Sequence, residues 1–88
     1  KPKIFTEKNI YKPNETFNLF YKNIDSSSVG FKAGTIGSKN NLIQVISQEW
    51  GKISLKTLPG CTIQEGCDVT MKIVSDNNSY STIIKVLP

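Results

Sequence analysis

The stretch ETFNLFYK, residues 15–22, holds the clearest structural signal in the chain. Phe17, Leu19 and Tyr21 alternate with mostly polar neighbours, and a period of two is typical of a β-strand with one buried face. Residues 12–15, KPNE, predict a turn just before this strand, because proline presets the backbone angle that a turn requires. The stretch is therefore predicted to be a half-buried strand with Leu19 in the core.

Similar short apolar segments recur on both sides of this strand, whereas no window shows the apolar period of a helix. Gly, Pro, Asn, Asp and Ser separate the segments about every 8 to 12 residues, which is the pattern of a sandwich or barrel. We predict an all-β, antiparallel fold of seven to eight strands. The further strand segments are Lys3–Thr6, continued across Ile10 and Tyr11, then Val29–Ala33, Leu42–Ser47, Lys52–Thr57, Val69–Ile73 and Tyr80–Val86.

Several details of this fold follow from individual residues. Pro2 and Pro13 bracket the first strand, which is predicted to be an edge strand that switches sheets, because proline cannot donate to a ladder. Residues 42–47 are apolar enough to be predicted as buried on both faces. Residues 35–41 predict a longer loop, and residues 76–79, DNNS, predict a tight hairpin connection.

The two cysteines, Cys61 and Cys67, enclose a loop of five residues, 62–66. The chain has no histidine, so two sulfurs cannot complete a four-ligand zinc site, and the spacing excludes a C-x-x-C redox motif. We predict a disulfide that closes a loop between two strands. Such a bond indicates an oxidising compartment and therefore an extracellular or cell-surface protein.

This cysteine loop has two interpretations. In the first, the disulfide only staples a loop, which helps a small domain with a modest core. In the second, the loop is a preorganised recognition tip that presents Ile63, Gln64 and Glu65.

The charge pattern argues against nucleic-acid binding. The net charge is +4, but all 11 basic residues are lysines and they are spread evenly along the chain. Nucleic-acid binders usually cluster their charge and use arginine for bidentate contacts. Because no apolar run approaches the roughly 20 residues that span a bilayer, no membrane insertion is expected within the chain.

The sequence offers little for catalysis. Nucleophilic catalysis of the Ser–His or Cys–His kind needs a base, and no histidine is present. The seven carboxylates are scattered over turns, and no glycine-rich phosphate loop occurs. We therefore predict that the protein is not an enzyme and that it holds neither a metal ion nor another cofactor.

Surface features point to carbohydrate in two ways. Sequons at Asn14 and Asn77 fall in predicted exposed turns, where a glycan is accommodated if the source is eukaryotic. A lone Trp50 with the three tyrosines is the other feature, since aromatic rings can stack on a sugar. The favoured interpretation is that Trp50 plugs one end of the fold, and the alternative is that it belongs to a sugar-binding platform.

Two stretches carry a resemblance to a known group. Residues 12–21, KPNETFNLFY, look like the second-strand opening of many tandem surface repeats. Residues 51–60, GKISLKTLPG, followed by residues 68–86, are similar to the closing half of cadherin-like repeats of the dystroglycan type. The resemblance implies one immunoglobulin-like β-sandwich over residues 1–88, as one module of a longer chain.

The resemblance also implies a non-catalytic function in adhesion or structure. The expected partners are neighbouring domains or another protein chain. Two alternatives are a carbohydrate-binding module with a glycan ligand, and a filament subunit in which residues 1–6 or 83–88 donate a strand to the next copy.

Overall fold

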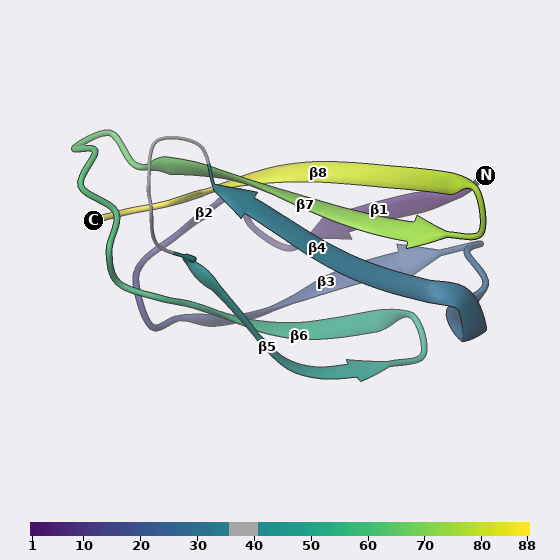
Figure 1. Ribbon diagram of the computed structural model, residues 1–88. Helices are drawn as coiled ribbons and strands as arrows, with labels where there is room; N and C mark the ends of the chain where they lie inside the picture. Colours follow the sequence, from purple (N-terminus) through teal and green to yellow (C-terminus); the bar gives the residue numbers. More distant parts are fainter. Residues whose placement is uncertain (36–40) are drawn as a thin grey trace.

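Two four-stranded sheets face each other in the computed structural model, which describes residues 1–35 and 41–88 (Figure 1). One sheet has the strand order β1-β3-β6-β5 and the other has the order β2-β8-β7-β4. The all-β sandwich of seven to eight strands is thereby confirmed. The elements are β1 (Lys3–Thr6), β2 (Ile10–Tyr11), β3 (Thr16–Lys22), the 3-10 turn η1 (Ser26–Ser28), β4 (Val29–Thr35), β5 (Ile43–Glu49), β6 (Lys52–Thr57), β7 (Cys67–Ser75) and β8 (Asn78–Val86).

The first strand switches sheets, as the prolines predicted. β1 pairs antiparallel with β3 in one sheet, and β2 pairs with β8 in the other. The β2–β8 pairing is parallel, whereas the other strand pairs of the described residues are antiparallel, as predicted. Its physical reason is that the chain keeps its direction when it crosses between the sheets, and this direction is also that of β8 (Figure 1).

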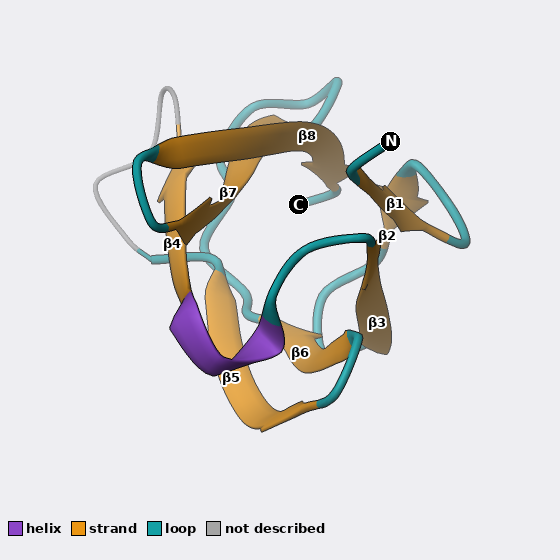
Figure 2. Cartoon of the chain, turned by 90° about the vertical axis from the view of Figure 1, so that its right-hand side faces the viewer, coloured by secondary structure: helices purple, strands orange, loops and turns teal. Residues whose placement is uncertain are grey.

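The two sheets face each other in the view along the strands (Figure 2), and their buried side chains form one core cluster. The inward side chains follow the predicted period of two: Leu19 is buried as predicted, and Ile84 of β8 is buried too. Fully burying an aliphatic or aromatic side chain stabilises a fold by about 1.5–3 kcal/mol. The other buried apolar residues are Tyr11, Phe17, Tyr21, Leu42, Ile43, Ile53, Leu55, Cys61, Cys67, Val69, Met71, Ile73 and Val86.

The strand β5 departs from its prediction. Leu42 and Ile43 are buried, but Val45 is 41% exposed and Ile46 is 52% exposed, so burial on both faces is wrong. The reason is position, because β5 lies at the end of its sheet and pairs with β6. A bulge between Val45 and Ser47 further disturbs the alternation.

Two predicted connections have different outcomes. The hairpin at residues 76–79 is confirmed: Ser75 pairs with Asn78, so Asp76 and Asn77 form the loop. Asp76 adopts a φ of 54°, a left-handed conformation that aspartate tolerates. Of the predicted loop at 35–41, residues 36–40 lie outside the described residues.

Candidate interaction surface

The hairpin between β5 and β6 presents the one tryptophan of the chain. Glu49 pairs with Lys52, which leaves Trp50 and Gly51 as the turn, and Gly51 has a left-handed φ of 74°. The Trp50 side chain is 82% exposed, so the prediction that it plugs one end of the sandwich is wrong. A residue at the apex of a two-residue turn projects beyond the sheets, and the buried Tyr21 lies below this hairpin instead.

Tyr21 fixes the position of this hairpin. Its backbone N–H donates to the Gly51 carbonyl at 3.0 Å. Its hydroxyl lies 3.2 Å from the carbonyl oxygen of Glu49 and 3.1 Å from Oγ of Ser26. The hairpin is therefore tied both to β3 and to the turn η1, and Trp50 is presented on a rigid base.

The neighbouring turn η1 is itself capped by Asp25. The Oδ1 atom of Asp25 accepts from the backbone N–H of Ser27 at 3.0 Å and from its hydroxyl at 2.8 Å. These hydrogen bonds, first from the hydroxyl and then from the backbone, lower the pKa of the Asp25 carboxyl. The cap orders the segment that faces the hairpin.

A groove of about 230 Å³ separates the hairpin from η1 and β4. Its lining combines a buried ring, an aliphatic wall and polar groups at the rim: Tyr21, Ser26, Val29, Gln48, Glu49 and Trp50. Val45 and Ile46, the two exposed apolar residues of β5, lie farther from the hairpin along the same strand. We call Val45, Ile46 and Trp50 the β5 surface.

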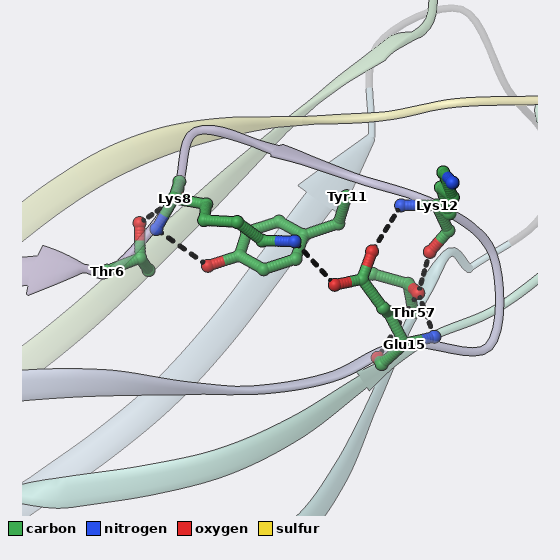
Figure 3. A network of polar contacts seen from close by, with 6 residues as sticks. All are labelled: Thr6, Lys8, Tyr11, Lys12, Glu15 and Thr57. Atoms are coloured by element: carbon green, nitrogen blue, oxygen red, sulfur yellow. Dashed lines mark hydrogen bonds and ion pairs between the residues drawn. The ribbon is translucent and has the colours of Figure 1, made fainter.

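The opposite flank of the sandwich is organised differently (Figure 3). There the segment between β1 and β2 crosses from one sheet to the other, and Tyr11, only 2% exposed, fills the gap. The Tyr11 ring stacks on Phe17 with 4.2 Å between centroids. Its hydroxyl accepts from the backbone N–H of Lys8 at 3.1 Å.

Glu15 holds this crossing segment in place (Figure 3). One carboxylate oxygen forms an ion pair with Lys8 Nζ at 2.6 Å, and the other accepts from the Lys12 N–H at 2.9 Å. These contacts, with Lys8 first, lower the pKa of Glu15, and Glu15 raises the pKa of Lys8. Thr57 Oγ1 donates to the Lys12 carbonyl at 2.5 Å and accepts from the Glu15 N–H at 2.9 Å. The polar groups satisfy one another, so this cluster is a structural clasp.

The cysteine loop is closed by the predicted disulfide. Cys61 and Cys67 are bonded with their Cα atoms 5.8 Å apart, and both are buried. Ile63 is half-buried and packs against the core, whereas Gln64 and Glu65 are exposed. Of the three residues in the hypothetical recognition tip, the structure therefore places two toward solvent.

The remaining predicted surface residues are dispersed. The sequon residues Asn14 and Asn77 are both exposed and lie in turns. Tyr11 and Tyr21 are buried and Tyr80 is half-buried, so the tyrosines do not extend the Trp50 ring into an exposed aromatic platform.

Among residues 1–35 and 41–88, no group of three or more His, Cys, Asp or Glu side chains lies close enough to hold a metal ion. No helix within those two ranges is long and apolar enough to cross a membrane.

Comparisons with known proteins gave no match: no protein-family model, no curated protein and no solved structure matches this chain. Any functional conclusion therefore depends on the surface described above.

Proposed function

We propose that the protein is a non-catalytic, immunoglobulin-like extracellular module that works in adhesion or structure by binding another protein chain. The observation that carries this proposal is the exposure of Trp50 on a hairpin tied down by Tyr21. Tryptophan is enriched among the residues that dominate binding energy at interfaces. Rigid presentation lowers the ordering cost of binding, because the loop has less freedom to lose.

The strand order supports the immunoglobulin-like part of the proposal. The order β1-β3-β6-β5 corresponds to strands A, B, E and D of a constant-type immunoglobulin domain, and β4, β7 and β8 correspond to C, F and G. The disulfide between Cys61 and Cys67 supports an oxidising, extracellular setting.

The position of the two termini supports a place in a multidomain array. Lys1 and Pro88 lie at opposite ends of the long axis (Figure 1). The domain measures 37 × 21 × 19 Å, so flanking domains joined at both termini would follow one another along the 37 Å axis.

Site-specific photocrosslinking tests the proposal. Trp50 is replaced by p-benzoylphenylalanine in the protein displayed on its native cell surface, and the control carries the same group at Ile83, an exposed apolar site on β8. We expect a discrete protein adduct from position 50 and none from position 83. Adducts that are absent from position 50, or that are the same from both positions, would contradict the proposal.

Carbohydrate binding is the second candidate, because the groove beside Trp50 combines an exposed ring with the polar Gln48, Glu49 and Ser26. Since the chain has one tryptophan, its fluorescence reports on this site alone. A panel of neutral and acidic oligosaccharides should quench or shift the emission if this candidate is correct. Unchanged emission at millimolar sugar would exclude it.

Strand donation is the weaker alternative. The two segments expected to donate are already paired within the chain, β1 (Lys3–Thr6) with β3, and β8 (Asn78–Val86) with β7 and β2. Donation would therefore require exchange of a strand between copies. Sizing of the chain should show polymers in that case.

A further inference from the structure

The outermost strands of the two sheets differ in how well they are protected against pairing. Natural sheets protect exposed edges with lysine, proline or very short strands. β1 carries Lys3 and follows Pro2, β4 carries Lys32 in its centre, and β2 (Ile10–Tyr11) has two residues. β5 (Ile43–Glu49) has seven residues, contains neither lysine nor proline, and exposes Val45 and Ile46.

We infer that β5 is an association edge that adds the β5 strand of a second copy of this chain around a two-fold axis. This inference rests on the proposed function, and it identifies the binding partner as a second copy of the chain. In the described part of the chain, β5 pairs with β6 on one side, so the backbone groups on its other side are available for an added strand.

The faces of β5 allow this self-pairing. Val45 and Gln48 lie opposite the buried Leu55 and Ile53 of β6, which places them on the inner face. Gln44 and Glu49 lie opposite Lys56 and Lys52 on the outer face. An antiparallel register that pairs Gln44 with Glu49, Val45 with Gln48 and Ile46 with Ser47 therefore matches inner with inner and outer with outer side chains.

Charge complementarity favours a second copy as the occupant. Glu49 is the one charged residue of β5, and its carboxylate forms an exposed ion pair with Lys52 of the same copy at 3.3 Å. In this register Glu49 of each copy lies opposite Gln44 of the other, whose neighbour on β6 is Lys56. Lys56 and the incoming Glu49 then flank Gln44 on the outer face, about 10 Å apart at the backbone, within reach of two long side chains. Each copy supplies both halves of this pair, so the contact occurs twice.

In the same register, the bulge and Trp50 both lie at the contact between the two copies. The bulge at Ile46 carries no charged side chain, and it places an exposed isoleucine at the centre of the two-fold pairing. Trp50 follows Glu49 and falls beside Ile43 of the second copy. Self-association should therefore cover the indole ring.

Sedimentation equilibrium from about 10 μM to 1 mM, within the range of weak protein contacts, tests the inference on the intact chain. We expect a reversible dimer and a concentration-dependent blue shift of the Trp50 emission. Ile46→Lys should weaken association by at least about tenfold, because each copy would bring a lysine to the axis. The matched control, Ile83→Lys on β8 with 59% exposure, should leave the dimer unchanged. Circular dichroism verifies that both variants fold.

A charge exchange tests the register itself. Glu49→Lys should weaken the dimer, because it places two lysines beside Gln44. The triple variant Glu49→Lys, Lys52→Glu, Lys56→Glu should restore it, because it also reverses the ion pair between Glu49 and Lys52 within each copy. A dimer that survives Ile46→Lys, or a charge exchange without recovery, would overturn the inference. A chain that stays monomeric at 1 mM would also overturn it. If the position-50 crosslink then captures a different protein, the proposed function stands and only self-pairing is wrong.

Discussion

The two flanks of the sandwich differ in how far they expose an aromatic side chain to solvent. On the flank where the chain passes from β1 to β2, Tyr11 is 2% exposed and stacks on Phe17. On the β5 flank, Trp50 is 82% exposed. Tyr11 precedes the turn at Pro13 and Asn14, whereas Trp50 lies in the two-residue turn between β5 and β6. The difference shows that burial here depends on whether a segment crosses between the sheets or turns back within one sheet.

The largest expected effect tests this contrast directly. Tyr11→Ala should lower the free energy of unfolding by about 3 kcal/mol, because it removes a buried ring and leaves a cavity beside Phe17. Trp50→Ala should change it by less than about 0.5 kcal/mol, as for other exposed sites. Urea unfolding followed by circular dichroism measures both. Equal losses in the two variants would show that the flanks do not differ in stability.

Removing the disulfide is expected to have a smaller effect on stability, and it tests the same comparison between the Tyr11 flank and the Trp50 flank. Tyr11 pairs with Val86, and Val86 pairs with Cys67, so the disulfide anchors the row of residues that contains Tyr11. Replacing Cys61 and Cys67 together by serine should lower the free energy of unfolding by about 2 kcal/mol, the chain-entropy value for so short a loop.

Hydrogen exchange of the same double variant locates the effect. The amides of Lys85 and Leu87, which donate to the carbonyls of Asn9 and Tyr11, should exchange faster. The Trp50 emission should stay unchanged, because the hairpin lies on the other flank. Faster exchange confined to β5 would contradict this assignment.

The local sequence predicted the strands well because their signal is the alternation of neighbouring residues. Phe17, Leu19 and Tyr21 show it within one strand, and the structure buries all three. Residues 42–47 carry a similar apolar content, yet most of them are exposed. The sequence pattern indicates how apolar a strand is. The position of that strand in the sheet, however, is set by pairing with residues far away in the chain.

The candidate surface was harder to predict for the same reason. Trp50 was expected in the core because a lone tryptophan usually supplies buried area, and no local signal placed the β5–β6 turn at the end of an outer strand. One usable signal was present in the composition. Residues 41–48 contain no lysine, although lysines are otherwise spread along the chain.

The smallest expected effect concerns pH and the clasp on the Tyr11 flank. The pKa of Glu15 is lowered in the folded protein by Lys8 and by the Lys12 N–H. Its contribution to stability is therefore present above the unfolded value of about 4.3 and is lost as the pH falls through the folded pKa. The folded protein should accordingly lose stability as the pH falls below about 4.3, as the Glu15 carboxylate gains its proton.

Variants of the two ion-pair partners isolate this contribution. Glu15→Gln should remove part of the decline in the urea midpoint between about pH 5 and pH 2, and Lys8→Met should remove less of it, because the Lys12 N–H still favours the carboxylate. The lowered pKa of Asp25, on the turn beside the Trp50 hairpin, leaves a residual slope in both variants. A slope identical to that of the unmodified protein in Glu15→Gln would show that the clasp is too well solvated to distinguish one flank from the other, since exposed ion pairs are strongly screened.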